Sequence, residues 1–168
     1  WILFSFVILV FISCEPQEEK GPPNIIFFFT DDQAYDTTRA YGNPDTNTPN
    51  MDKLANEGVV FMRHYNTTAI CMASRANVMT GQFEYKTGCN FTHGPLGTKQ
   101  WSTSYPLLLK QAGYRIGFGG KFGFSVSDNK DDWKPEGTIA QHDFDFWVGG
   151  PGQTSYKTAD NPALAHYA

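Results

Sequence analysis

Positive charge and cysteine are both scarce in this sequence. Its 168 residues include 13 Lys and Arg against 17 Asp and Glu, which gives a net charge of −4 at pH 7. A nucleic-acid-binding protein normally carries a basic face, so this charge balance argues against nucleic acid as a partner. The three cysteines, at positions 14, 71 and 89, are too few and too far apart to form a disulfide framework.

Low-complexity segments and internal repeats are also missing. Hydrophobic residues make up 40% of the chain and aromatic residues 15%. That composition is too apolar for a disordered chain, and the length fits one globular domain. We therefore expect a packed core.

The longest apolar run lies at the N-terminus and is too short to cross a bilayer. Residues 1–13 carry no charge, whereas a membrane-spanning helix needs about 20 apolar residues. We interpret this run as the core of a secretion signal. A start methionine and a basic leader are absent, so we expect the sequence to begin inside its reading frame.

The end of this run resembles a bacterial lipoprotein processing site. Ser13 precedes Cys14, and in such sites the cysteine becomes the new N-terminus and carries the lipid. The alternative is an ordinary cleaved signal with an incidental cysteine. Residues 14–23 are then a solvated tether, and the expected location is outside the cytoplasm, anchored by lipid to an outer membrane or facing the periplasm.

The rest of the chain alternates predicted strands and helices. Residues 48–58, 73–80 and 102–112 are predicted to be helices that end at glycine, and residues 99–101 and 125–138 are predicted to be loops. Strands are predicted at residues 24–30, 59–65, 114–119 and 144–148. This alternation predicts an α/β fold, with a mainly parallel sheet flanked by helices.

Two adjacent carboxylates, Asp31 and Asp32, follow the first predicted strand directly. Ligands bind at the carboxyl ends of strands in open α/β sheets. Neighbouring carboxylates repel one another unless a cation compensates, and oxygen ligands suit calcium or magnesium. The two readings of this pair are a metal site and a solvated turn.

Cys71 stands four residues before Arg75, at the start of a predicted helix. A thiol at a helix N-terminus and close to an arginine is reactive, whereas a lone cysteine is more often buried and inert. His64 and His93 are the nearest histidines in the sequence, but nothing in the sequence ties either to Cys71 as a base.

The segment from Cys71 to Gly81 resembles the signature of the type I sulfatases, in the alkaline phosphatase-like superfamily. That signature is Cys, any residue, Pro or Ala, a small residue and Arg, followed by a helix that ends in Thr-Gly. This chain has Cys71, Met72, Ala73, Ser74 and Arg75, and then Thr80 and Gly81. Three further segments are similar in order and spacing: residues 24–33, 48–61 and 105–121.

The resemblance implies a sulfuric ester hydrolase with an alkaline phosphatase-like fold, of which residues 24–168 are the N-terminal part. It implies that a maturation enzyme oxidises Cys71 to formylglycine, whose hydrated aldehyde attacks sulfur with one hydroxyl and expels sulfate with the other. Asp31 and Asp32, with residue 71, would hold Ca²⁺, or Mg²⁺ as second choice. Arg75 and Lys121 would offer positive charge to the sulfate oxygens. The implied substrates are sulfated small molecules or saccharides, such as sulfated polysaccharides.

The chain departs from the family pattern after Lys121. The family usually has an aromatic residue and then a histidine, which contacts the formylglycine hydroxyl, but this chain has Phe122 and Gly123. His142 lies too far along the chain to be assigned that role and is read as a surface histidine.

Family members are considerably longer, and their later site residues have no counterpart here, so we expect a truncated sequence whose chain alone is inactive. The alternatives to a sulfatase are a phosphatase or phosphodiesterase of the same superfamily and a lipid-anchored binding protein with a degenerate site. The first normally has a Thr or Ser nucleophile and several histidine ligands for zinc, whereas this chain has Cys71 and four histidines. Gly123, in place of the usual histidine, is the feature that favours a binding protein with a degenerate site.

Overall fold

The computed structural model describes residues 21–132 and 140–150. The chain divides into two compact units, residues 1–33 and 34–168, and each is described by itself. The predicted secretion signal, Cys14 and most of the predicted tether lie outside the described residues, as does the end of the loop predicted at residues 125–138. Among the described helices, none is long and apolar enough to cross a membrane.

The predicted buried strand at residues 24–30 is not a strand in the structure. Its five large apolar side chains, from Ile25 to Phe29, are between 41% and 86% exposed. The rings of Phe27 and Phe29 lie on the same side of the chain, 5.9 Å apart. A strand forms through hydrogen bonds to neighbouring strands, and the sheet among the described residues does not include this segment. The prediction of a buried strand at residues 24–30 is therefore wrong for the described structure.

The second unit begins with two 3₁₀ helices, η1 (Tyr35–Thr37) and η2 (Arg39–Tyr41), and the helix α1 (Pro49–Glu57). The predicted helix at 48–58 is thus confirmed, with Pro49 in its first turn. Thr48 is the N-cap residue, but its hydroxyl makes no capping bond to the backbone. It donates instead to the carboxylate of Asp52, at 3.1 Å, and accepts the backbone N–H of Arg39.

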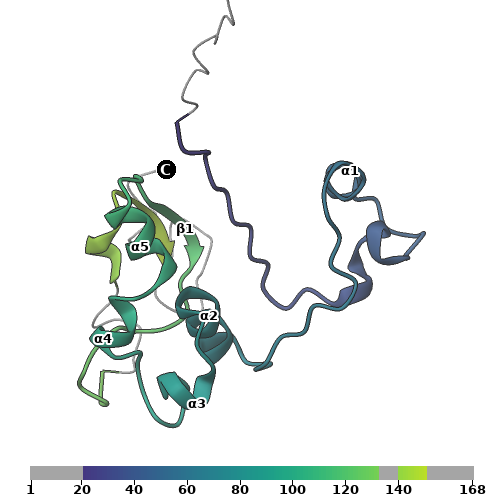
Figure 1. The fold of residues 1–168 in the computed structure, drawn as a ribbon. Coiled ribbons are helices and arrows are strands. Elements are labelled where there is room, and N and C mark those ends of the chain that lie inside the picture. Colours follow the sequence, from purple (N-terminus) through teal and green to yellow (C-terminus); the bar gives the residue numbers. More distant parts are fainter. Residues whose placement is uncertain (1–20, 133–139, 151–168) are drawn as a thin grey trace, which may run out of the picture. The chain divides into compact units, whose positions relative to one another are not determined.

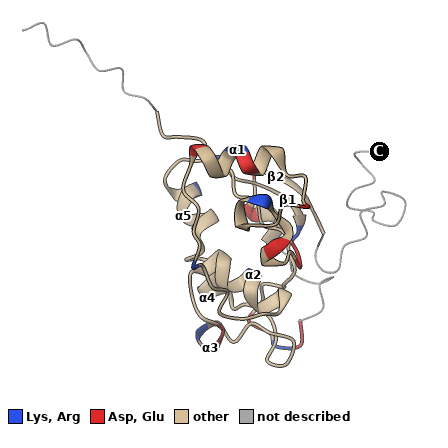
Figure 2. Cartoon of the chain, turned by 90° about the vertical axis from the view of Figure 1, so that its right-hand side faces the viewer, with Lys and Arg blue, Asp and Glu red and all other residues tan. Residues whose placement is uncertain are grey.

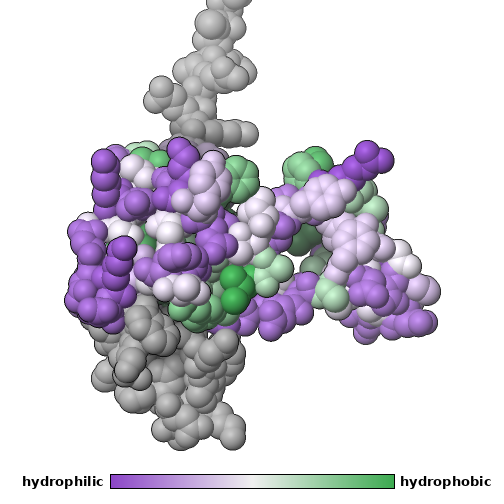
Figure 3. All heavy atoms as spheres, turned by 90° about the horizontal axis from the view of Figure 1, so that it is seen from below, coloured by the Kyte–Doolittle hydropathy of each residue, from purple (hydrophilic) through white to green (hydrophobic). Residues whose placement is uncertain are grey.

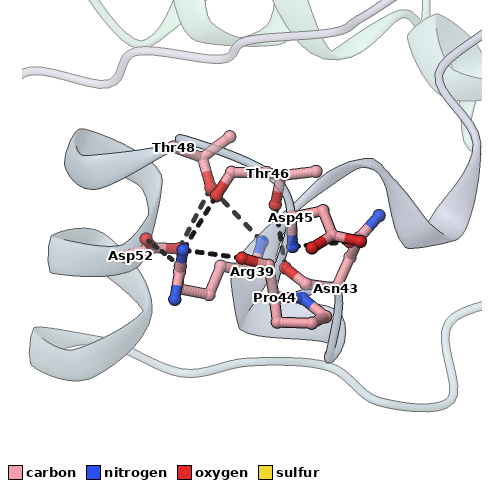
Figure 4. Close-up of polar contacts among 7 residues, drawn as sticks. All are labelled: Arg39, Asn43, Pro44, Asp45, Thr46, Thr48 and Asp52. Carbon is pink, nitrogen blue, oxygen red and sulfur yellow. Dashed lines mark hydrogen bonds and ion pairs between the residues drawn. The ribbon is translucent and has the colours of Figure 1, made fainter.

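Arg39 ties the loop before α1 together, as Figure 4 shows. Its Nη2 donates to the carbonyl oxygens of Pro44 and Thr46, at 2.8 and 3.2 Å. Its Nε lies 3.9 Å from a carboxylate oxygen of Asp52. One side chain therefore joins η2, the loop and α1.

Four more helices follow: α2 (Cys71–Thr80), α3 (Glu84–Thr87), α4 (Thr98–Trp101) and α5 (Tyr105–Gln111). The helices predicted at 73–80 and 102–112 are confirmed as α2 and α5. Gly81, with a φ of +66°, ends α2 as predicted, because only glycine takes that left-handed angle without strain. The loop predicted at 99–101 is wrong, since those residues belong to α4. In Figure 1, α3 and α4 lie beside α2, and α2 contacts α3, α4 and α5.

The described sheet has two parallel strands, β1 (Gly117–Lys121) and β2 (Phe146–Gly150). Gly119 pairs with Val148 at the centre, and the 3₁₀ helix η3 (Ala140–Asp143) precedes β2. The strands predicted at 114–119 and 144–148 are confirmed with shifted ends. The strand predicted at 59–65 is wrong, because those residues form turns and irregular backbone with Val59, Phe61 and Tyr65 exposed.

Asp145 anchors the start of β2 to the start of β1. One carboxylate oxygen accepts the backbone N–H of Ile116, and the other lies 3.2 Å from Nζ of Lys110 on α5. The backbone hydrogen bond and then Lys110 lower the pKa of the Asp145 carboxyl, because both favour its charged form. These bonds connect α5 with both strands.

An aromatic cluster lies between the strands and the helices. Its buried rings are Trp101 of α4 with Phe122 and Phe124, which directly follow β1, and these pack on Phe118, Phe144 and Trp147. Ring centroids in the cluster are 4.3 to 6.4 Å apart. Met72, Ala76 and Met79 of α2 complete the core. Helices packed on a parallel strand pair confirm the predicted α/β arrangement among the described residues.

Charged and apolar residues are both spread over the described chain. In Figure 2, basic residues (blue) and acidic residues (red) occupy short stretches of the ribbon, separated by long uncharged stretches. In Figure 3, seen from below, apolar residues reach the surface in several places between hydrophilic ones. Exposed apolar side chains of the second unit include Leu54, Val59, Phe83, Tyr85 and Leu108.

Candidate functional site

Cys71 is the first residue of α2 and is partly exposed. It therefore differs from the buried, inert cysteine that the sequence left open as the alternative. Ile70, the N-cap residue, has extended backbone angles, and its carbonyl accepts the N–H of Ser74 at 2.9 Å. The helix thus starts at the signature cysteine, two residues before the predicted start at residue 73, and residue 71 is partly exposed there.

The segment before Cys71 is fastened to α2 by side chains. Nδ2 of Asn66 donates to the hydroxyl of Ser74 at 3.0 Å. Nδ2 of Asn77 lies 3.3 Å from the hydroxyl oxygens of both Thr67 and Thr68. Sequence reasoning did not identify these contacts. They restrict the chain that leads into residue 71.

Arg75 joins the helix to the sheet. It lies one turn after Cys71, on the same side of α2. Its Nη1 donates to the carbonyl oxygen of Lys121, the last residue of β1, at 2.6 Å. Both side chains are buried, with exposed fractions of 7% and 6%. The structure therefore brings together two of the predicted site residues, Arg75 and Lys121, at the carboxyl end of a parallel strand, and Cys71 stands one turn before Arg75 on α2.

Gly123 has the conformation and the surroundings that exclude a side chain. Its φ is +85°, in the left-handed region that favours glycine. A Cβ atom added there would lie 2.6 Å from Cδ of Arg75 and 3.8 Å from Cε of Lys121. The aliphatic part of Arg75 thus occupies the space that a histidine would need at this position, which gives the departure from the family pattern a structural explanation.

Asp31 and Asp32 belong to the N-terminal unit, so their geometry relative to Cys71 is not described. Asp32 has a φ of +51°, a left-handed angle that Asp tolerates better than most residues. Within residues 21–132 and 140–150, no group of three or more His, Cys, Asp or Glu side chains gathers as a metal site would require. The two carboxylates suit a hard divalent cation by their chemistry, as part of a larger oxygen ligand set.

The histidines do not join Cys71 in any described contact. His142 lies on η3 and is exposed, with Nε2 3.4 Å from the side-chain amide of Gln141, as expected for a surface histidine. His93 contacts the side chain of Asn90. His64 is exposed in the irregular segment before α2.

A comparison with protein families identifies the chain. The model of the sulfatase family matches residues 23–167, which is most of the sequence. The chain belongs to the sulfatase family. The order of elements fits this family, with the signature cysteine at the start of α2 and the lysine at the end of β1.

Individual sulfatases are similar over most of this chain. An N-acetylglucosamine-6-O-sulfatase of Bacteroides thetaiotaomicron is 37% identical over 89% of the chain and 28% of the relative. An N-acetylgalactosamine-6-sulfatase of Sus scrofa is 32% identical over 77% of the chain and 26% of the relative. An ulvan-active sulfatase of Formosa agariphila is 37% identical over 59% of the chain and 20% of the relative. The chain thus spans about a quarter of the length of these relatives, and no solved structure matches it.

Proposed function

We propose that the complete protein hydrolyses sulfate esters of saccharides, with residue 71 as formylglycine at the reacting centre. The observation that carries this proposal is the position of Cys71. It is accessible at the start of α2, one turn from an arginine that is hydrogen-bonded to Lys121. The relatives support a saccharide substrate, because two are named for 6-sulfated amino sugars and one for ulvan.

Arg75, Lys121 and residue 71 would have different roles in the reaction. Arg75 and Lys121 place positive charge beside residue 71, where the sulfate oxygens gain negative charge in the transition state. The hydrogen bond from Arg75 to the Lys121 carbonyl holds the guanidinium in one orientation, so little reorganisation is needed. The aldehyde, once formed and hydrated, would supply one hydroxyl that attacks sulfur and displaces the alcohol of the ester. Deprotonation of the second hydroxyl would then break the bond between residue 71 and the sulfate oxygen, which releases sulfate and restores the aldehyde.

Asp31 and Asp32 would hold a calcium ion, with magnesium as the second choice. Their oxygen ligands fit a hard cation, and such an ion lowers the pKa of a coordinated hydroxyl.

We also propose that the protein is exported and anchored through a lipid on Cys14. Detergent partitioning of the native protein and of Cys14→Ala tests the anchor. Recovery of both in the aqueous phase would refute it.

A binding protein without hydrolytic activity is the competing function, because Gly123 replaces a histidine that the family normally uses. The two functions predict different products. A sulfatase releases inorganic sulfate from 4-nitrophenyl sulfate or N-acetylglucosamine 6-sulfate, whereas a binding protein retains the intact ester.

Sulfate release by the complete protein therefore tests the proposal. We expect Cys71→Ala to abolish turnover, because alanine offers no attacking atom, while the protein still folds. Cys89→Ala is the matched control, since Cys89 is buried in the core and away from the proposed chemistry. If the native protein releases no sulfate, or if Cys71→Ala releases it at the native rate, the proposed function is wrong.

Cys71→Ser sharpens this test. A serine that the maturation enzyme leaves unmodified has one hydroxyl, so it can attack sulfur once but cannot expel sulfate easily. We expect a single turnover followed by arrest. Sustained turnover by a serine shown by mass to be unmodified would contradict the formylglycine mechanism.

A further inference from the structure

A cavity of about 500 Å³ lies beside α2, outside the group formed by Cys71, Arg75 and Lys121. Its lining comes from the segment before Cys71 and from the region of α3. It includes Thr67, Thr68, Phe83, Tyr85, Asn90 and His93. The volume is within the range of about 300–1,000 Å³ that is usual for small-molecule sites. The cavity is therefore large enough to hold one or two sugar rings.

Two aromatic rings line this cavity. The centroids of Phe83 and Tyr85 are 6.0 Å apart, and their planes are within 17° of parallel. Both are open to solvent, with 54% and 80% of each residue exposed. Exposing neighbouring aromatic side chains to water is unfavourable, so such pairs often mark a binding site. Flat rings of this kind suit the apolar C–H faces of a pyranose.

Polar groups of the cavity lining are held in place by hydrogen bonds. Nδ2 of Asn90 donates to Oε1 of Glu84 at 2.6 Å. Oδ1 of Asn90 accepts the backbone N–H groups of Thr92 and His93, at 2.9 and 2.7 Å. The side-chain amide of Asn90 also lies 2.9 Å from Nδ1 of His93. These bonds fill the hydrogen-bonding capacity of the Asn90 amide, which positions its two neighbours. The carboxylate of Glu84 and the imidazole of His93 are thus the groups that can meet hydroxyl groups, which both donate and accept.

The charge in the cavity indicates which part of a sulfated saccharide it would take. Glu84 lines the cavity and is an acceptor only when ionised, so it disfavours a sulfate or phosphate group there. The cations of the site, Arg75 and Lys121, do not line it. A neutral ring with several hydroxyls therefore fits better than the sulfate itself.

The cavity borders the segment that leads into residue 71. Thr68 lines it and stands three residues before Cys71, so their Cα atoms are at most about 11 Å apart. Asn77 of α2 fixes Thr67 and Thr68 by the hydrogen bonds described above. The subsite requires that a saccharide whose sulfate is at residue 71 extend past Thr68 to Phe83 and Tyr85.

We propose that this cavity is a subsite for an unsulfated sugar ring next to the sulfated one. The proposal rests on the proposed function and deepens it. It makes the protein a sulfatase of oligosaccharides, which selects its substrate partly through a ring that carries no reacting bond.

The experiment compares two substrates in each variant of the complete protein. It measures kcat/KM for a disaccharide of N-acetylglucosamine with one 6-sulfate and for 4-nitrophenyl sulfate, and takes the ratio of the two. In Tyr85→Ala the ratio should fall about tenfold, because the disaccharide loses its stacking surface. Tyr85→Trp keeps an aromatic face and should retain most of the native ratio. Phe91→Ala is the matched control, because Phe91 is 51% exposed, close to Phe83 in exposure, and does not line the cavity.

Binding of the unsulfated disaccharide, measured by titration calorimetry, separates this proposal from the proposed function. Binding that Tyr85→Ala weakens about tenfold supports the subsite even in a protein that hydrolyses neither sulfate ester. The subsite is overturned if native protein, Tyr85→Ala and Phe91→Ala hydrolyse both esters with the same ratio of kcat/KM values and bind the disaccharide equally well. That result leaves the proposed function standing. Absence of any disaccharide binding by the native protein also overturns the subsite.

Discussion

At the scale of single residues, Gly123 shows how a site adapts to a changed side chain. Arg75 lies so close to this glycine that a Cβ atom would be only 2.6 Å from its Cδ. Arg75 cannot move away freely, because it is buried and donates to the Lys121 carbonyl. The histidine expected by the family pattern therefore cannot simply be put back.

We predict that Gly123→His lowers both stability and sulfate release. The left-handed angle and the collision with Arg75 should together cost about 1–3 kcal/mol of the free energy of unfolding. Chemical denaturation measures this loss. Gly123→Ala adds the Cβ atom alone, and Gly113→Ala is its control. Gly113 has a similar φ of +90° but nothing within 4 Å of an added Cβ. Equal losses at the two glycines, or faster hydrolysis by Gly123→His, would contradict the steric explanation.

Cys89 differs from Cys71 in the state of its thiol. Cys89 is fully buried, and burial, with a smaller contribution from Glu84, raises its pKa from 9.0 to about 12. Between these two values the unfolded chain loses the proton that the folded chain keeps. The protonated thiol therefore contributes stability that is fully present below about pH 9 and is lost as the pH rises toward about 12.

We predict that the free energy of unfolding falls more steeply above pH 9 in the native protein than in Cys89→Ala. The difference in slope should approach about 1.4 kcal/mol per pH unit at most. Denaturation at several alkaline pH values measures it, and Cys89→Ala removes the titrating group while other groups still titrate. Parallel curves for the two proteins would show that Cys89 is not protected in the folded state.

At the scale of secondary structure, the helices could be predicted because their signals are local. Gly81 ends α2 and Pro49 opens α1 within the span of the helix itself. The strand predictions at residues 24–30 and 59–65 were wrong, because an apolar run shows β propensity but not whether a neighbouring strand is there to pair with it. The helix α4 was missed because four residues carry no apolar period.

The contacts of Arg39 show the opposite case, a local structure without a recognisable sequence signal. Its bonds to Pro44 and Thr46 and its contact with Asp52 hold η2, the loop and α1 together (Figure 4). We predict that Arg39→Ala increases hydrogen exchange of the amides in α1, with a loss of about 1 kcal/mol in local opening free energy.

Lys53→Ala is the control for Arg39→Ala. Lys53 lies on α1 itself and pairs with Glu57 at 3.9 Å, with both side chains at least 65% exposed. Such an ion pair contributes little, so exchange in α1 should hardly change. Similar increases in both variants would mean that the bonds of Arg39 to the loop carbonyls do not stabilise α1.

At the scale of the whole molecule, the candidate site could be predicted in part. Cys71 and Arg75 are joined by helix spacing, which the sequence shows directly. Lys121 lies 46 residues after Arg75, and only the resemblance to sulfatases connected the two before the structure placed them in contact. The cavity beside α3 could not be predicted, because its lining depends on how segments 67–68 and 83–93 fold onto α2.

The metal belongs to this scale because its ligands would come from separate parts of the chain. We predict that the complete protein contains about one calcium or magnesium ion, and that Asp31→Asn lowers this content strongly. Elemental analysis after dialysis measures it, and chelation should reduce sulfate release. Asp36→Asn is the matched control, as an exposed carboxylate five residues away on η1. Unchanged metal content in Asp31→Asn would contradict the assignment.

The mass of the peptide that contains residue 71 shows whether this residue is formylglycine in the complete protein. Trypsin cleavage after Arg63 and Arg75 releases residues 64–75 from the complete protein made in a host with a formylglycine-generating enzyme. We expect this peptide to be lighter than its unmodified form by the difference between a thiol and an aldehyde, and to shift by one hydrazone when treated with a hydrazide. A peptide with an intact Cys71 thiol, in protein that releases sulfate at full rate, would contradict the account.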